Sequence, residues 1–139
     1  MTWNGEIYNY IEIRNQLETL GRRFATRSDT EVLLSAFQEW GIGCFDRFIG
    51  FWAIALFDAV QGSVLLARDR IGKAPLYTCN TPSGICWASE ISALIIVAGS
   101  PTWTIREQST VDFLRWGIRD IGGATFFNEV RTFPAASYM

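Results

Sequence analysis

The spacing of apolar residues predicts two helices near the start of the chain. Between positions 10 and 20 apolar side chains recur every three or four residues, and Gly21 follows them where a left-handed stop is expected. A second helix is predicted from a cap at Ser28 or Asp29 to Gly41, with Glu31 placed to complete a capping box with Ser28. The apolar positions are Tyr10, Ile13, Leu17 and Leu20 in the first helix and Leu33, Ala36, Phe37 and Trp40 in the second.

Two later segments, 51–57 and 64–67, are apolar at successive positions, which is typical of strands covered on both faces. The turn residues 58–62 between them predict a hairpin, and a second hairpin is predicted within 77–87. Sequential strands joined in this way are antiparallel. We therefore expect an α+β fold in which one sheet carries helices on one face and a second sheet on the other.

The rest of the chain predicts two more helices and an extended tail. The helices run from Ser89 to Val97 and from Ser109 to Trp116, and Gly99-Ser100-Pro101 interrupts the pattern between them. Segments 125–127 and 130–139 have extended character.

Length and composition indicate one soluble layered domain, because 139 residues with 49% hydrophobic content are enough to build a core. A net charge of -2 without a long basic cluster argues against nucleic acid as a partner. The apolar stretches are too short to cross a membrane, and the first residues lack a signal-peptide pattern. We expect a cytoplasmic protein with no membrane partner.

The three cysteines are expected to be reduced, structural thiols. Their odd number and the absence of C-x-x-C spacing argue against a disulfide framework, and a chain without histidine has few ligands for zinc. Cys79 and Cys86 flank the turn at 81–84, so a hairpin there would bring them face to face. This pair is open to two interpretations, small apolar fillers of the hairpin or a redox switch.

The first candidate for chemistry is Asn4-Gly5. The Asn side chain offers an amide donor, and Gly lets its own backbone N–H approach a ligand, so the step suits a developing oxyanion. Asp29 is placed to hold a ligand's ammonium group. The local alternatives are a tight turn for Asn4-Gly5 and a helix cap for Asp29.

Four ordered stretches, 4–10, 28–32, 67–77 and 88–94, carry a resemblance that covers nearly the whole chain. Their sequences are NGEIYNY, SDTEV, ARDRIGKAPLY and ASEISAL. In this order and spacing they resemble the glutamine-hydrolysing domain of asparagine synthetases, which are class II glutamine amidotransferases of the N-terminal-nucleophile hydrolase fold. Segment 133–138 resembles the end of that domain, although the family usually has Gly where Ala136 stands.

The resemblance implies an αββα sandwich of antiparallel sheets and a role for each matching residue. In such enzymes an N-terminal cysteine attacks the side-chain amide of glutamine, and its own α-amino group acts as the base. By resemblance, Asn4 and Gly5 form the oxyanion hole and contact substrate, Glu6 lines the glutamine site, and Asp29 binds the α-ammonium group. Glutamine is therefore the expected ligand.

The expected nucleophile is not among these 139 residues, which start at Met1-Thr2-Trp3. Cys44 follows the second predicted helix in a stretch without family motifs, and no base is adjacent to the hairpin cysteines. We expect residues 1–139 to be a partial, truncated glutaminase domain, lacking its nucleophile segment and inactive alone. In an asparagine synthetase the ammonia serves ATP-dependent amidation of aspartate, so ATP and magnesium would belong to a synthetase domain outside this segment.

Two other functions stay open. One is a different class II amidotransferase, of the amino-sugar or purine branch. The other is a non-catalytic interaction module, for which an incomplete sandwich would expose apolar area and favour self-association. Arg68 and Asp69 are either catalytic or an ion pair that fixes the turn to Gly72 and Pro75. Glu90 is either a helix-start acid or an interface residue.

Overall fold

The computed structural model describes residues 1–99, 102–119 and 121–139. Its helices and strands occur in groups along the chain, and the last strand returns to the sheet that contains the first strand. They are β1 (Thr2–Ile7), α1 (Tyr10–Thr19), α2 (Asp29–Trp40), the 3-10 helix η1 (Gly41–Cys44), β2 (Gly50–Asp58), β3 (Ser63–Arg68), β4 (Tyr77–Thr81), β5 (Gly84–Ala88), α3 (Ile91–Val97), α4 (Glu107–Trp116), β6 (Val130–Thr132) and β7 (Ser137–Tyr138).

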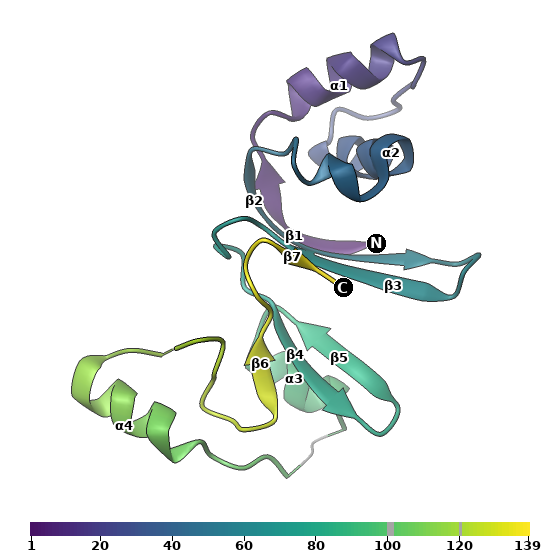
Figure 1. The fold of residues 1–139 in the computed structure, drawn as a ribbon. Coiled ribbons are helices and arrows are strands. Elements are labelled where there is room, and N and C mark those ends of the chain that lie inside the picture. The colour runs from purple at the N-terminus through teal and green to yellow at the C-terminus, as the bar shows by residue number, and fades with distance from the viewer. Residues whose placement is uncertain (100–101, 120) are drawn as a thin grey trace.

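Two antiparallel sheets form the centre of the molecule. The first has the strand order β1-β2-β3-β7 and the second the order β5-β4-β6. Figure 1 shows α1 and α2 on the outer side of the first sheet, and the second sheet with α3 on the opposite side. The predicted antiparallel pairing, both hairpins and the placing of helices and sheets are therefore confirmed.

The first sheet is apolar on both faces, as its sequence predicts. On the helix side, Ile54 and Leu56 pack with Ile13 and Leu17 of α1 and with Leu33 of α2. On the other side, a second cluster joins it to the second sheet and its connecting segments: Ala53, Ala55, Leu66, Ala74, Leu76 and Phe133, with Ile85 and Trp87 packed against them. Burial on both faces fixes this sheet between the two other layers.

The caps of α1 and α2 explain where these helices end. Gly21, with φ of 90°, provides the left-handed stop after α1. Ser28 is the N-cap of α2, and its Oγ accepts a hydrogen bond from the Thr30 backbone N–H at 3.1 Å. The predicted capping box is wrong, because the Glu31 carboxylate instead accepts from the backbone N–H groups of Ala25 and Thr26.

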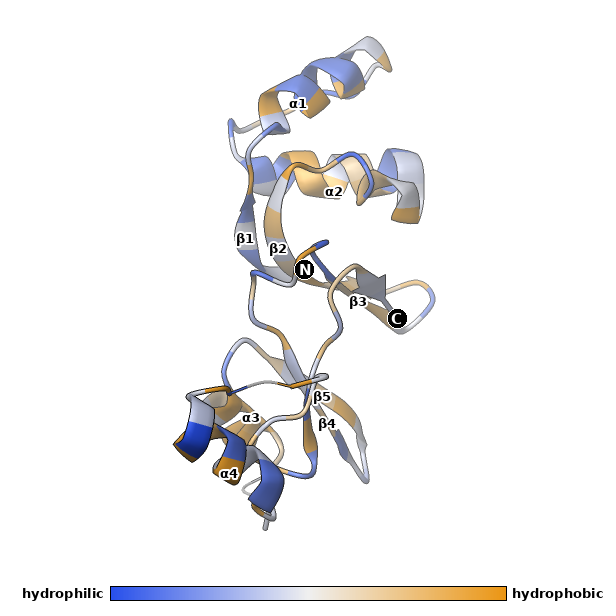
Figure 2. Cartoon of the chain, turned by 60° about the vertical axis from the view of Figure 1, so that its left-hand side comes forward, coloured by the Kyte–Doolittle hydropathy of each residue, from blue (hydrophilic) through white to orange (hydrophobic). Residues whose placement is uncertain are grey.

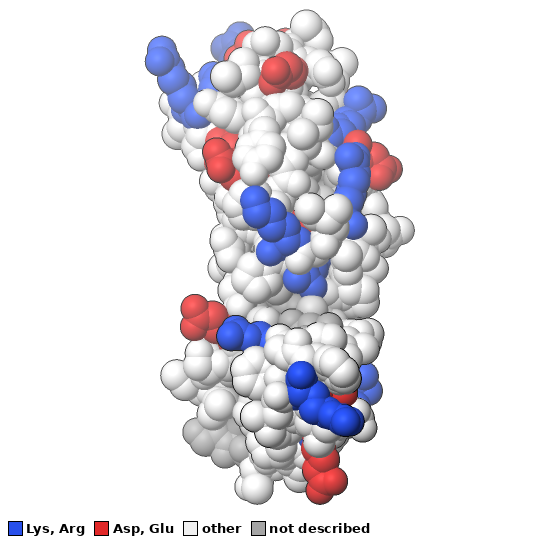
Figure 3. Space-filling view, turned by 90° about the vertical axis from the view of Figure 1, so that its left-hand side faces the viewer, with Lys and Arg blue, Asp and Glu red and all other residues white. Residues whose placement is uncertain are grey.

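The later helices follow the prediction with shifts of two residues at their starts, to Ile91 and Glu107. The predicted break at Gly99-Ser100-Pro101 lies partly outside the described residues, since Ser100 and Pro101 are not described. No helix in the described ranges has the length and apolar content needed to cross a membrane. On the face in Figure 3, acidic and basic side chains are both spread over the two halves of the molecule.

Candidate functional site

Asn4 and Gly5 lie within β1 and not at a turn, so the tight-turn alternative is wrong. Gly5 is paired with Trp52 of β2, and its φ is 149°. A Cβ at Gly5 would lie 2.1 Å from the Phe51 carbonyl oxygen and 2.7 Å from Trp52 Cα. Only glycine therefore permits this approach of the two strands.

The alternation of β1 separates its side chains into two groups. Trp3 faces the helices, where its Nε1 donates to Thr30 Oγ1 at 3.2 Å, and Ile7 is buried in the core beneath them. Asn4 and Glu6 are exposed on the other face, and neither side chain has a hydrogen-bond partner among the described residues. Because β1 borders only β2, its second edge is also unpaired in the described sheet.

Glu6 and Asp29 line one open cavity of about 380 Å³ at the end of β1. Asp29 is half-buried, and its Oδ2 accepts a hydrogen bond from the Ile7 backbone N–H at 3.4 Å. Its Oδ1 has no partner in the described part of the chain and is free to meet a ligand. Asp29 is the first residue of α2 and Ser28 its cap, so the helix-cap alternative for Asp29 is wrong.

Asn4 lines a different cavity, of about 190 Å³, between the two sheets. Ala53 of β2 and Trp87 of β5 line it as well. The structure therefore brings Glu6 and Asp29 together and places Asn4 two residues along the same strand face. With a rise of about 3.3 Å per residue, Asn4 and Glu6 are about 7 Å apart along β1.

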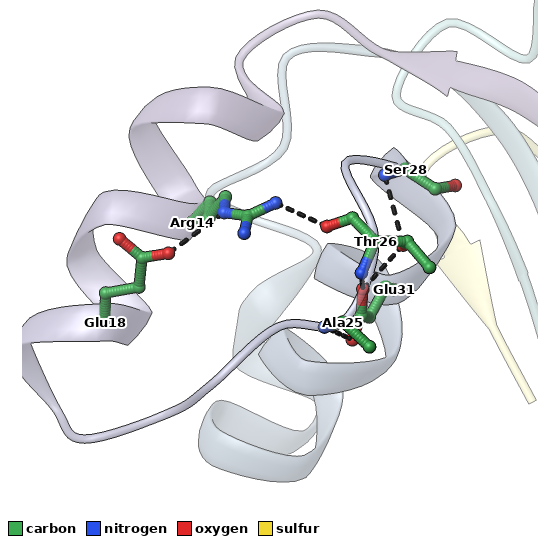
Figure 4. Close-up of polar contacts among 6 residues, drawn as sticks. All are labelled: Arg14, Glu18, Ala25, Thr26, Ser28 and Glu31. Carbon is green, nitrogen blue, oxygen red and sulfur yellow. Dashed lines mark hydrogen bonds and ion pairs between the residues drawn. The ribbon is translucent and has the colours of Figure 1, made fainter.

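Figure 4 shows the loop before α2, which hydrogen bonds tie to Glu31 of α2 and to Arg14 of α1. Glu31 Oε2 accepts from the Thr26 hydroxyl at 2.6 Å and from the Thr26 backbone N–H at 2.7 Å, and Oε1 accepts from the Ala25 N–H at 2.8 Å. Arg14 of α1 donates to the Thr26 carbonyl oxygen at 2.6 Å. These bonds, the Thr26 hydroxyl first, hold the pKa of Glu31 below its usual value.

Tyr8, Tyr10 and Arg27 also line the Glu6–Asp29 cavity, and the sequence analysis did not single them out as site residues. The Arg27 guanidinium gives the cavity a positive charge beside its two carboxylates. In the sequence, the signal that could have identified Arg27 as a site residue is its position directly before Ser28 and Asp29.

Comparison with known proteins decides the family. The family model described as "Glutamine amidotransferase domain" matches residues 1–139. The chain belongs to the glutamine amidotransferase domain family.

Curated relatives of this amidotransferase chain extend the comparison. It is 38% identical over 93 residues to asparagine synthetase [glutamine-hydrolyzing] 3 of Bacillus subtilis, covering 67% of the chain and 15% of the relative. It is 40% identical over 96 residues to a putative asparagine synthetase [glutamine-hydrolyzing] of Mycobacterium tuberculosis, with coverage of 68% and 15%. The chain thus spans about 15% of the length of these relatives, and the predicted resemblance to asparagine synthetases is confirmed.

A solved structure supports the predicted fold class. Glutamine phosphoribosylpyrophosphate amidotransferase from Bacillus subtilis, complexed with ADP and GMP, matches with a TM-score of 0.60 and 26% identity. The match covers 70% of this chain and 23% of the solved one. The mixed fold of helices and antiparallel sheets is therefore that of a class II amidotransferase of the N-terminal-nucleophile hydrolase type.

Arg68 and Asp69 of the amidotransferase chain are both buried and bind backbone groups. Arg68 donates to the carbonyl oxygens of Gly72, Ala74 and Phe133 at 2.5, 2.7 and 2.6 Å. No ion pair joins Arg68 to Asp69 in the described residues, so the ion-pair alternative is wrong although the turn is fixed as expected.

Whereas Arg68 donates hydrogen bonds, the Asp69 carboxylate accepts them, and the donors are backbone N–H groups. Burial raises the pKa of Asp69, but these hydrogen bonds outweigh burial and lower it. The donors are the N–H groups of Ala74, Lys73, Trp52 and Ile71. A carboxylate engaged in this way stabilises a turn and has little capacity left for substrate.

The cysteines and Glu90 lie away from the Glu6–Asp29 cavity. Cys44 is fully buried in the core, and burial raises the pKa of its thiol to about 12, which is unfavourable for a nucleophile. Cys79 and Cys86 belong to β4 and β5 of the second sheet. Glu90 is the N-cap of α3, where its carboxylate accepts from the Ser92 hydroxyl at 3.2 Å.

Proposed function

We propose that residues 1–139 form part of a glutaminase unit that hydrolyses the side-chain amide of glutamine in an enzyme of the asparagine synthetase type. The observation that carries the proposal is the cavity shared by Glu6 and Asp29, next to Asn4 on the same strand of a glutamine amidotransferase domain. The relatives named as glutamine-hydrolysing asparagine synthetases support the substrate.

Each residue has a role that its position supports. The free Oδ1 of Asp29 binds the α-ammonium group of glutamine, and Glu6 adds a second carboxylate to the same cavity. Asn4 donates its side-chain N–H to the oxyanion, together with the backbone N–H of Gly5. In this arrangement glutamine lies along the exposed face of β1, with its ammonium group in the Glu6–Asp29 cavity and its amide towards Asn4.

The nucleophile of this reaction comes, in our proposal, from chain outside residues 1–139. Cys44 has a buried thiol with a raised pKa, and Cys79 and Cys86 lie in the other sheet. An external cysteine with its α-amino group as base would complete the site beside Asn4. Residues 1–139 are thus a partial glutaminase domain, which we expect to release no ammonia from glutamine alone.

We infer that the ammonia serves the ATP-dependent amidation of aspartate, since the relatives are named asparagine synthetases, and this step requires further chain as well. On the resemblance to asparagine synthetases, we assign ATP and magnesium to a synthetase domain outside this segment.

The test uses a complete enzyme that carries this segment and its nucleophile. Replacing Asn4 with Ala is expected to lower the kcat for glutamine hydrolysis by about 10²–10³, which corresponds to about 2.7–4 kcal/mol of barrier stabilisation. Asp29→Asn is expected to act mainly on KM, because ammonium binding precedes the chemical step. Asn80→Ala, which removes an exposed asparagine of β4 outside both cavities, is the matched control and leaves both constants unchanged.

Two outcomes would overturn parts of this proposal separately. Near-normal turnover by Asn4→Ala removes Asn4 from the mechanism. Ammonia release at an ordinary enzymatic rate by the unmodified 139-residue chain would show that its own residues supply the nucleophile.

A purine-branch amidotransferase is the second candidate, because the solved structural relative uses phosphoribosylpyrophosphate according to its name. The curated relatives at 35–42% identity favour the asparagine synthetase type. The acceptor that the complete enzyme amidates, aspartate or a phosphoribosyl compound, distinguishes the two.

A non-catalytic interaction module is the third candidate function. Glutamine hydrolysis by the complete enzyme would exclude it.

A further inference from the structure

Two cysteines lie directly opposite each other in the second sheet, away from the proposed glutamine site. Cys79 of β4 is the register partner of Cys86 of β5 in the antiparallel hairpin. Residues paired in this way have Cα atoms about 4.5–5.5 Å apart, and a disulfide needs about 4.4–6.8 Å. We propose that Cys79 and Cys86 are a redox-active pair that forms a reversible intramolecular disulfide.

The hairpin holds the two backbones opposite each other, so a side-chain rotation is enough to bring the two sulfur atoms together. Burial of Cys79, followed by the influence of Cys86, raises the pKa of the Cys79 thiol. Cys44 is in a separate cluster on the helix side of the first sheet and cannot compete.

The two cysteines differ in exposure, and this difference sets the order of reaction. Cys79 is 3% exposed and packs with Leu94 of α3 and Val130 of β6. Cys86 is half-buried and reaches solvent. A small-molecule disulfide in solution therefore meets Cys86 first.

The chemistry is a thiol–disulfide exchange in two steps. The Cys86 thiolate, having lost its proton to water, attacks one sulfur of a disulfide RSSR, which gives a Cys86–S–S–R mixed disulfide and releases one RS⁻. The Cys79 thiol then loses its proton and attacks Cys86 Sγ, which forms the Cys79–Cys86 bond and releases the second RS⁻. Two protein thiols are oxidised and one RSSR is reduced to two RSH, so no further oxidant is needed.

The bond would fix a part of the molecule that borders the cavity of Asn4. Trp87 follows Cys86 and lines that cavity, together with Ala88 and Ser89. Closing the disulfide restricts the strand that carries these residues. The proposal itself rests on the hairpin alone and stands whether or not Asn4 binds an oxyanion.

The experiment equilibrates the 139-residue chain with mixtures of oxidised and reduced glutathione and then blocks free thiols with iodoacetamide. Peptide mapping by mass spectrometry is expected to show Cys79 linked to Cys86 and Cys44 alkylated. In the folded chain the equilibrium constant for the link should exceed that in concentrated urea by about tenfold or more, which is about 30 mV for this two-electron couple. Equal constants in both conditions, or links that include Cys44 or a second chain, would overturn the proposal.

Single variants test the order of reaction. Cys79→Ser is expected to stop at the glutathione mixed disulfide on Cys86, and Cys86→Ser should leave Cys79 unmodified. Cys44→Ser is the matched control and forms the link as the original chain does. A stable mixed disulfide on Cys86 in the original, folded chain would show that Cys79 does not resolve it, and would also contradict the proposal.

Discussion

At the scale of single residues, Ala136 is the described non-glycine residue with a left-handed backbone, with φ of 51°. An L side chain in this conformation costs about 1–2 kcal/mol, which explains why glycine is expected here from the family resemblance. Replacing Ala136 with glycine would relieve this strain, but part of the stabilisation is offset because glycine loses more conformational freedom on folding. Ala136→Gly should therefore raise the free energy of unfolding by about 0.5–1 kcal/mol, measured by urea denaturation.

The neighbouring Ala135 provides the control for this prediction, since it is not in the left-handed region. Ala135→Gly adds the entropy cost without relieving strain, so it should lower the free energy of unfolding. Loss of stability in both variants would show that the conformation of Ala136 is not strained.

Gly5 and Ser28 show which residue-level features the sequence could predict. The Ser28 cap depends only on the residues that follow it, and it is one of the two cap positions, Ser28 or Asp29, that the sequence predicted. The strand conformation of Asn4-Gly5 depends on pairing with Phe51 and Trp52, far away in sequence. Local rules assign Asn-Gly to turns, whereas the donor chemistry of the two residues and the family resemblance pointed to an oxyanion role.

At the scale of elements, the carboxylate of Glu31 couples the start of α2 to the loop before it. Its pKa is lowered by the Thr26 hydroxyl and by the Ala25 and Thr26 N–H groups, so the folded chain holds this proton less tightly than the unfolded chain. The stabilisation is complete above the unfolded value of about 4.3 and is lost as pH falls through the lower folded pKa. We expect Glu31→Gln to reduce stability at pH 7 and to remove this part of the acid sensitivity.

Urea denaturation of the original chain and of Glu31→Gln, at several pH values from 7 down to 3, tests this expectation. The difference in stability between the two proteins should shrink as the solution becomes more acidic. A difference that stays constant over the whole range would mean that the Glu31 charge does not hold the loop.

The helices were easier to predict than the short strands, for a physical reason. The apolar spacing of α1 and α2 repeats within each segment, and each helix makes its backbone hydrogen bonds internally. β1 and β7 are held as strands by pairing with β2 and β3, which are distant in sequence. The hydrogen bonds of Glu31 with residues 25 and 26 likewise depend on how the loop before α2 folds back. The capping-box pattern in the sequence gives no information on the conformation of this loop.

At the scale of the whole molecule, Arg68 joins segments that connect the two sheets. Its three acceptors are on the turn after β3, on the segment leading to β4 and at Phe133, just after β6. Replacing Arg68 with Met leaves buried carbonyl oxygens without donors, and each costs about 1–3 kcal/mol. We predict that Arg68→Met lowers the free energy of unfolding by about 3–5 kcal/mol, measured by urea denaturation.

Arg131→Met is the control for Arg68, because Arg131 is an exposed arginine of β6. It should change stability by less than about 0.5 kcal/mol. Similar losses in both variants would mean that the carbonyl contacts of Arg68 do not hold the layers together.

The assembly of the site is a property of the whole fold that the sequence could not specify from local patterns. Glu6 is at the end of β1 and Asp29 at the start of α2, and the packing of α2 on the first sheet brings them to one cavity. The resemblance assigned both to one ligand without indicating that Asn4 lines a second cavity. Arg27, Tyr8 and Tyr10 entered the site only through this packing.

The far end of the molecule carries exposed apolar side chains on α3 and α4, and Figure 2 shows that α4 combines hydrophobic and hydrophilic residues. Leu114 and Trp116 are 77% and 69% exposed, and Ile96 of α3 is 78% exposed. Apolar area of this kind favours association, so we expect the 139-residue chain to form oligomers as its concentration rises. Sedimentation velocity over a concentration series measures this directly.

Charged variants locate the surface responsible for this association. Leu114→Glu should weaken it by about tenfold or more, because association would bury the new carboxylate. Leu20→Glu changes an exposed leucine after α1, at the opposite end of the molecule, and should leave association unchanged. A chain that stays monomeric at every concentration and unfolds cooperatively would contradict the prediction, because it would show that these apolar side chains are tolerated in water.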